Sequence, residues 1–195
     1  MTTVSQTAIE YEAKILDIDP QQVAARILDQ GGVKVGEALQ RRYVYDIEVG
    51  DASRWIRLRD TGSQTTLTIK EINSDEIGGT VETEVIVSDF ETTNLLLAKL
   101  GYQPKAYQEN HRRSFALDGA QLEIDSWPLI PPYLEIEGAD RDEVIRIAVQ
   151  LGYNEEQLTG ENTTKVYSRY GIDLATITDL RFRTEVADLS GIREH

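Results

Sequence analysis

The sequence predicts an α+β protein built from antiparallel strands whose two faces differ in character. The stretch 9–15, Ile-Glu-Tyr-Glu-Ala-Lys-Ile, alternates apolar and charged residues with the period of two that a β-strand imposes. Similar alternation recurs at 53–59, 66–70, 80–85, 122–127 and 133–138. Three stretches with the helical spacing of apolar residues lie between these strands. We therefore expect strands with one charged and one apolar face, and helices that cover the apolar faces.

Capping residues and glycines mark the ends of these three helices. The predicted N-caps are Asp19 (followed by Pro20), Ser88-Asp89 and Asp140, and the predicted stops are Gly31-Gly32, Gly101 and Gly152. In the second helix, the apolar stripe Leu95, Leu96, Ala98 and Leu100 is expected to face the sheet.

The remaining stretches read as extended segments, turns and short helices. Residues 33–49 and 102–117 are long and extended, and Asp118-Gly119 predicts a type I′ hairpin turn. Residues 72–79 are polar and end in two glycines, which indicates a mobile loop. Short helical segments are expected near 155–158 and 163–170. The tail after Gly171 mixes apolar and acidic residues, so packed and frayed tails are both open.

Composition bounds the functional class. The 195 residues fit a single domain (1–195), with a core at about 8–170 and a C-terminal tail at about 171–195. The net charge of −14 disfavours nucleic acid and anionic membranes as partners. The chain has no cysteine, no signal-peptide pattern and no apolar run near the roughly 20 residues that span a bilayer. We expect a soluble, cytoplasmic protein, and a homodimer remains open.

The charged strand faces carry the chemistry. Sorted by strand parity, one face collects the residues Glu10, Glu12, Lys14, Arg57, Arg59, Thr66, Thr68, Lys70, Glu82, Glu84, Glu123, Asp125, Glu135 and Glu137. An open sheet with a solvated, salt-bridged face is the simplest interpretation of any one strand. Taken together, the strands favour another, because carboxylates two residues apart repel unless a cation lies between them.

Four acid pairs at this spacing indicate a divalent metal ion, and the Arg57-x-Arg59 pair with Lys70 indicates an anion with several charges, such as a phosphate chain. Oxygen ligands without His or Cys favour Mg²⁺ or Mn²⁺ over zinc. Closing the sheet into a barrel would place both sets in one lumen, and a barrel of about eight strands holds one small ligand. In that arrangement, carboxylates hold the metal, the metal bridges phosphate oxygens and basic residues neutralise the remaining charge, as in phosphoryl transfer.

The ordered set of charged residues resembles the CYTH superfamily, the triphosphate tunnel metalloenzymes. The resemblance begins at Glu10-x-Glu12-x-Lys14 and covers roughly residues 8–170. It continues in order through Arg57-x-Arg59, Lys70, Glu82-x-Glu84, Arg112, Asp125 and Glu135-x-Glu137. The family includes class IV adenylyl cyclases, thiamine triphosphatases and inorganic triphosphatases. The resemblance therefore implies an eight-stranded antiparallel β-barrel with helices outside, which is metal-dependent and binds ATP, inorganic triphosphate or thiamine triphosphate.

The resemblance also implies roles for individual residues. Phosphate contacts fall on Lys14, Arg57, Arg59, Lys70 and Arg112; metal ligands fall first on Glu10, Glu12 and Glu137 and next on Glu135 and Asp125; Glu82 and Glu84 are candidates for a second metal or for orienting the basic residues. Asn110 stands where family members often carry a lysine. The C-terminal candidates Lys165, Ser168 and Arg169 are not separated by sequence.

Two reactions fit such a site, namely hydrolysis of the terminal phosphate and cyclisation of ATP to cAMP and pyrophosphate. A non-catalytic sensor of polyphosphate or nucleotide is the alternative. His111 has the opposite parity to Arg112 and is expected at the surface. Trp55 and Trp127 are expected to pack at the barrel ends, with Trp127 and Pro128 at the rim.

Overall fold

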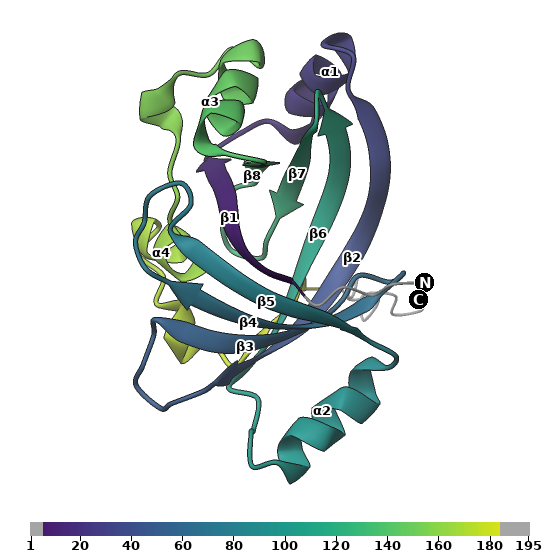
Figure 1. The fold of residues 1–195 in the computed structure, drawn as a ribbon, viewed down its shortest axis with the longest axis vertical. Coiled ribbons are helices and arrows are strands. Elements are labelled where there is room, and N and C mark those ends of the chain that lie inside the picture. The colour runs from purple at the N-terminus through teal and green to yellow at the C-terminus, as the bar shows by residue number, and fades with distance from the viewer. Residues whose placement is uncertain (1–5, 184–195) are drawn as a thin grey trace, which may run out of the picture.

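The alternating strands close on themselves. The computed structural model describes residues 6–183, with side-chain detail from residue 8. Its eight long strands are β1 (Gln6–Ile15), β2 (Val33–Asp46), β3 (Arg54–Asp60), β4 (Thr65–Ile72), β5 (Thr80–Val87), β6 (Ala106–Leu117), β7 (Ala120–Ser126) and β8 (Tyr133–Gly138). They pair antiparallel in the order β2-β3-β4-β5-β1-β8-β7-β6, and pairing of β2 with β6 completes the barrel (Figure 1). The predicted eight-stranded antiparallel barrel is confirmed.

Within residues 6–183, four α-helices lie outside this barrel (Figure 1). They are α1 (Pro20–Asp29), α2 (Phe90–Lys99), α3 (Arg141–Gln150) and α4 (Thr163–Arg169), accompanied by the 3₁₀ turns η1 (Glu155–Gln157) and η2 (Leu174–Thr176). The carboxylates of Asp19, Asp89 and Asp140 accept backbone N–H bonds in the first turns of α1, α2 and α3, as their positions predict. Among the described residues, no helix has both the length and the apolar character needed to cross a membrane.

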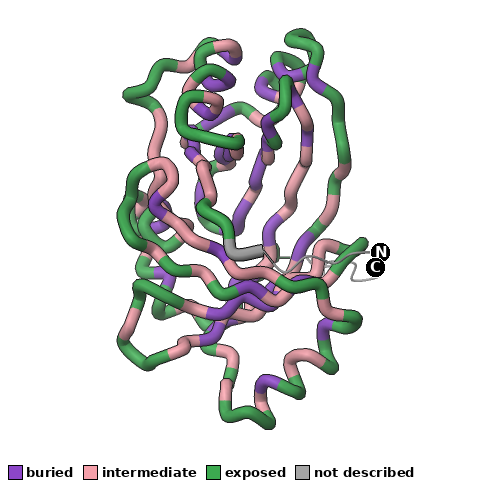
Figure 2. Tube along the Cα trace, in the orientation of Figure 1, coloured by how far each residue is buried: buried purple, intermediate pink, exposed green. Residues whose placement is uncertain are grey.

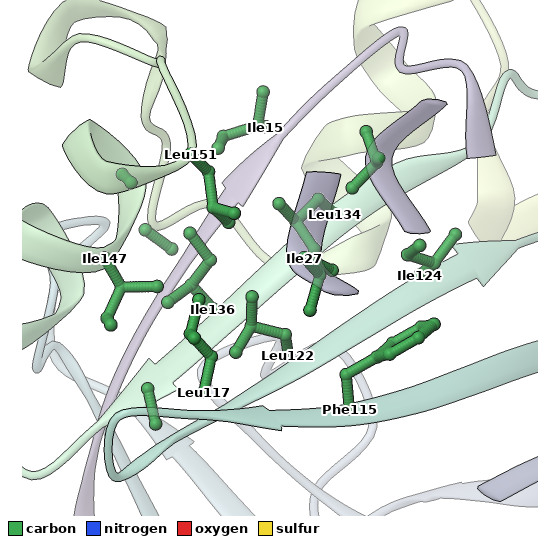
Figure 3. Close-up of a cluster of buried hydrophobic side chains, with 14 of the residues drawn as sticks. Ile15, Ile27, Phe115, Leu117, Leu122, Ile124, Leu134, Ile136, Ile147 and Leu151 are labelled. Carbon is green, nitrogen blue, oxygen red and sulfur yellow. The ribbon is translucent and has the colours of Figure 1, made fainter. Parts of the chain in front are cut away.

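The main hydrophobic core lies between the barrel and the helices α1 and α3. Ile27 of α1 and Ile147 of α3 point toward Leu122, Leu134 and Ile136 on the outer face of β7 and β8 (Figure 3). Each of these five side chains is fully buried, and burying one such side chain contributes about 1.5–3 kcal/mol. Because these strands turn their apolar side chains outward, their charged side chains are left to face the lumen.

The buried face of α2 differs from the predicted one. Leu95, Leu96 and Leu100 are more than half exposed, whereas Phe90 and Leu97 are buried. These two pack with Tyr45 and Leu58 on the outer face of β2 and β3. Three consecutive leucines at 95–97 do not indicate which side of the helix is buried. The position of α2 over these strands decides which leucine is covered.

The turn and tail predictions can also be compared with the structure. Asp118 and Gly119 both have positive φ, 48° and 95°, as a type I′ turn requires. The tail is packed as far as it is described: Leu174 and Leu180 are buried, and β9 (Asp179–Leu180) pairs parallel with β6. Residues 184–195 of the predicted tail lie outside the described residues. Figure 2 shows buried positions concentrated along the strands and exposed positions in loops and outer helix faces.

Candidate triphosphate and metal site

The barrel encloses a cavity of about 760 Å³. Its lining includes the predicted site residues Glu10, Glu12, Lys14, Arg57, Arg59, Lys70, Glu82, Glu84, Arg112, Glu135 and Glu137. Asp125 is the exception, since its side chain is fully buried and is not part of the lining. Strand closure therefore brings together residues that are as many as 127 positions apart between Glu10 and Glu137.

Carboxylates crowd one side of this cavity, on β1 and β8. Glu12 is paired directly across from Glu137, and Lys14 directly across from Glu135. We call Glu10, Glu12, Glu135 and Glu137 the acidic wall. Like charges placed directly opposite each other on adjacent strands are destabilising. The acidic wall therefore calls for a neutralising cation.

Lys14 supplies part of that neutralisation. Its buried Nζ lies 2.6 Å from Glu12 Oε1 and 3.3 Å from Glu135 Oε2. Burial opposes the charged form of Lys14, but the two carboxylates outweigh it and raise the pKa of this lysine. Burial likewise opposes the charged form of Glu135, yet Lys14 and Arg112 hold its pKa far below its usual range.

Glu137 receives no such partner. Among the described residues, no cation lies within ion-pair distance of its carboxylate and no donor is hydrogen-bonded to it. Burial, together with the charges of Glu10, Glu135 and Glu12, raises the pKa of Glu137 to about 7. It is the carboxylate that a bound cation would relieve most.

The acid pair on β5, Glu82 and Glu84, forms ion pairs with basic residues of the lumen. Glu82 forms an ion pair with Lys70, whose Nζ also donates to Glu10 Oε2 at 3.0 Å. Arg57 Nη2 lies 3.4 Å from both Glu82 Oε2 and Glu84 Oε2. Burial and Arg57 lower the pKa of Lys70. Glu82 and Glu84, expected either to hold a second metal ion or to orient the basic residues, thus contact two basic residues of the lumen.

Arginines gather on the other side of the cavity, on β2 and β3. Arg42 is paired directly across from Arg59, and Arg57 is two residues before Arg59 on β3. We call Arg42, Arg57 and Arg59 the basic wall. Around the barrel, β4 and β5 separate it from the acidic wall on one side, and β6 and β7 separate them on the other. The two walls therefore face each other across the lumen.

Each arginine of the basic wall retains an unused donor. Among the described residues, the buried Nε atoms of Arg42, Arg57 and Arg59 have no hydrogen-bond acceptor. Arg57 and then burial lower the pKa of Arg59 to about 9. Buried donors without acceptors and crowded positive charges both favour the binding of an anion with several oxygens.

Asp125 holds Arg112 rather than facing the lumen. Arg112 Nε and Nη2 donate to the two oxygens of Asp125 at 2.8 and 2.5 Å, and Asn110 Nδ2 donates to Asp125 Oδ1 at 2.9 Å. Arg112 also lies 3.1 Å from Glu135 Oε1. Both oxygens of Asp125 are thus engaged by neighbouring side chains.

The chemistry of the acidic wall fits a hard divalent cation. All its donors are carboxylate oxygens, which Mg²⁺ and Mn²⁺ prefer, and Glu137 lacks a partner. In the described part of the chain, no three His, Asp or Glu side chains are already gathered at chelating distance. Glu10 and Glu12 are instead held by Lys70 and Lys14. An incoming ion would therefore compete with these two lysines.

Several lining residues were not singled out from the sequence. Arg42 is one of them, because the Arg41-Arg42 doublet places one arginine on each face of the strand. The sequence signal for Arg42 is that it shares the face of Gln40 and Val44. Trp55 and Trp127, which are expected to pack at the barrel ends, both line the cavity, and Trp127 is also buried against Tyr167. His111 lies on the outer face near Glu37, as expected.

The structure separates the three C-terminal candidates by position. Lys165 lines the cavity, and its Nζ lies 2.5 Å from Asp75 Oδ2. Ser168 donates to the backbone carbonyl of Thr164, and Arg169 pairs with Glu161. Neither Ser168 nor Arg169 belongs to the cavity lining.

Comparison with known proteins agrees with this geometry. The family model described as the CYTH domain matches residues 8–168. The chain belongs to the CYTH family. The resemblance seen in the order of charged residues is thereby confirmed. No protein with a curated function matches the sequence.

Solved structures share the CYTH fold of this chain. The PH1012 protein from Pyrococcus horikoshii is 20% identical, with a TM-score of 0.68 over 78% of this chain and 96% of its own. A candidate adenylate cyclase from Vibrio parahaemolyticus is 13% identical, with a TM-score of 0.71 over 84% and 99%. The candidate adenylyl cyclase HpAC1 from Hippeastrum, described with a dominant triphosphatase activity, is 17% identical, with a TM-score of 0.53 over 83% and 96%.

Proposed function

We propose that this CYTH protein is an enzyme that acts on a triphosphate with the help of a divalent metal ion, Mg²⁺ or Mn²⁺. The observation that carries the proposal is the placement of the acidic wall and the basic wall on opposite sides of one lumen. A metal ion neutralises only the acidic wall, and a phosphate chain binds only the basic wall. A metal-bound triphosphate satisfies both.

Each wall then has a defined role. We assign Glu10, Glu12 and Glu137 to the metal ion, with Glu135 beside them, and Lys14, Arg57, Arg59, Lys70 and Arg112 to the phosphate oxygens. Glu82 and Glu84 orient Lys70 and Arg57, and Asp125 orients Arg112. When bound, the ion would polarise phosphoryl oxygens and neutralise their charge.

Two reactions share this clamp. In hydrolysis, water attacks the terminal phosphorus, the bond to the bridging oxygen breaks, and the leaving diphosphate carries away the electron pair. Arg57 and Arg59 would stabilise the developing charge. In cyclisation, the ribose 3′-hydroxyl of ATP attacks the α-phosphorus and pyrophosphate leaves. The dominant triphosphatase activity described for HpAC1 favours hydrolysis as the reaction to test first.

A product assay tests the proposal. The purified protein is incubated with ATP, inorganic triphosphate or thiamine triphosphate, in Mg²⁺, Mn²⁺ or chelator, and the products are separated. We expect turnover of at least one substrate with metal and none in chelator. Tight binding of tripolyphosphate without any product would overturn the proposal that the protein is an enzyme and would favour a non-catalytic sensor. Turnover that is unaffected by the chelator would remove the metal from the proposal.

A further inference from the structure

Arg42 is a buried cation whose charge is not neutralised directly by any side chain in the described part of the chain. Its side chain is 7% exposed and lines the cavity. No carboxylate of the described residues lies within ion-pair distance of it. Lys14 and Lys70, by contrast, each contact two carboxylates. Buried charges are normally paired, so a solitary buried guanidinium on a lumen wall points to a ligand.

Two uncharged groups fix the position of Arg42. Its Nη2 donates to Asn110 Oδ1, and its guanidinium carbon lies 4.5 Å from the ring centre of Trp127. Asn110 is fully buried, and its Nδ2 donates to Asp125 Oδ1 at 2.9 Å. An ionised carboxylate only accepts hydrogen bonds, so Asp125 forces the amide oxygen of Asn110 toward Arg42. This arrangement orients Arg42 without neutralising it.

The charge of Arg42 is held at an electrostatic cost. Arg59 lies directly across from it on β3, and Arg57 and Arg112 are also close enough to repel it. Burial, followed by these three arginines, lowers the pKa of Arg42 to about 9. A residue with only a packing role beside Trp127 would avoid this cost by being neutral. Guanidiniums that converge on one wall of a lumen match the oxygens of a phosphoryl group.

We propose that Arg42 is a further phosphate-contacting residue, that it binds one phosphoryl group together with Arg59, and that Asn110 is the residue that positions it. This inference rests on the proposed function, because it assumes that the anion in the lumen is a polyphosphate. It adds a cation from β2 to the set inferred from the sequence. It also explains why an uncharged Asn110 stands behind the basic wall.

The first test compares Arg42→Gln with Arg41→Gln. Arg41 is the matched control, since it is the adjacent residue on β2 and forms its ion pairs outside the lumen, with Asp60 and Glu91. Inorganic tripolyphosphate is titrated calorimetrically in chelator, so that turnover does not obscure binding. We expect Kd to rise about 10- to 100-fold in Arg42→Gln, the loss of a charge-assisted contact, and to stay unchanged in Arg41→Gln.

The second test moves the charge instead of removing it. In the double variant Arg42→Gln/Asn110→Lys, a cation returns to the same region from β6, and we expect much of the lost affinity to return. Asn110→Leu alone should weaken binding, yet should add little in the Arg42→Gln background, because Asn110 acts through Arg42. Thermal unfolding of each variant confirms that it is folded. A purely structural role predicts additive losses and no rescue.

The outcomes separate the two proposals. Wild-type affinity in folded Arg42→Gln would overturn the inference about Arg42 and leave the proposed function standing. Absence of tripolyphosphate binding by the wild-type protein would overturn the phosphate contact, whereas the proposed function fails on the metal-dependent product assay. Additive effects of Arg42→Gln and Asn110→Leu would overturn the positioning role of Asn110.

Discussion

Glu12 on β1 and Glu137 on β8 are direct cross-strand partners, and both side chains line the cavity. Glu12 is neutralised by Lys14, whereas Glu137 contacts no cation among the described residues. Two carboxylates in this relation, inside a barrel, raise the free energy of the metal-free protein. Under the proposed function, a divalent ion would relieve this repulsion. The first two predictions test these two consequences separately.

Replacing Glu12 should remove metal-dependent turnover while the barrel stays folded. Loss of a residue that hydrogen-bonds to a metal ligand typically lowers metal affinity or activity about 10- to 100-fold, so loss of a direct ligand should lower kcat/KM in Mg²⁺ by at least about 100-fold in Glu12→Gln. Glu71→Gln is the matched control, because Glu71 is exposed and does not line the cavity. The measurement is a metal titration of product formation. Full turnover of Glu12→Gln at low metal concentration would contradict the assignment.

The stability of the metal-free protein should depend on pH through Glu137. Its pKa of about 7 in the folded protein lies above the usual 4.5, so between these values the folded state retains a proton that the unfolded chain has lost. Stability therefore falls as the pH rises through this window, and the full cost is present above about pH 7.

Glu137→Gln should abolish the loss of stability that ionisation of Glu137 causes. We expect the variant to equal the wild type near pH 4 and to be more stable by about 2 kcal/mol at pH 8, a value reduced for partial solvent screening. Urea unfolding in chelator at several pH values measures the difference, and carboxylates common to both proteins cancel in it. A difference that is independent of pH would show that Glu137 titrates normally in the folded barrel.

Lys14 should be a large contributor to stability when no metal is bound. Lys14→Met keeps the bulk of the buried stem but leaves Glu12 without its cation. Removing one partner of a buried ion pair costs about 3–5 kcal/mol, and we expect a loss in this range in chelator. Excess Mg²⁺ should restore part of it.

Lys99→Met on the exposed side of α2 is the control for this prediction, with an expected change within about 0.5 kcal/mol. Urea unfolding measures both variants. If Lys14→Met changed stability no more than Lys99→Met does, the buried carboxylates would have to be protonated in the wild-type protein.

Strand parity explains how far the site could be predicted from sequence. A period of two assigns Glu10, Glu12 and Lys14 to one face whatever the strand pairs with, and the lumen follows once the sheet closes. Arg42 shares its parity with Gln40 and Val44, but Arg41 beside it places a second arginine on the opposite face, so the doublet alone does not show which arginine belongs to the lumen. The role of Asp125 depends on the register between β6 and β7, which places it across from Arg112. Parity gives the face of a residue but not its partner.

The same limit applies to the helices. The caps at Asp19, Asp89 and Asp140 are local signals, since each carboxylate bonds to backbone within three residues, and all three are confirmed. The buried face of α2 is not local. Leu97 is covered because α2 lies over Leu58, and no spacing within the leucine run contains that information.

Arg57 should discriminate between polyphosphate and monophosphate. Its Nη2 lies 3.4 Å from side-chain oxygens of Thr68, Glu82 and Glu84, and these contacts fix its position in the basic wall. A chain of phosphates can contact several basic residues at once, whereas a single phosphate binds wherever one cation is available. Arg57→Ala should therefore raise Kd for tripolyphosphate about 10- to 100-fold and alter orthophosphate binding little. Arg41→Ala is the control, because Arg41 pairs with Asp60 and Glu91 and none of these three residues lines the cavity. Calorimetric titration with both anions measures the two constants, and an equal loss for both would mean that Arg57 contributes only general positive charge.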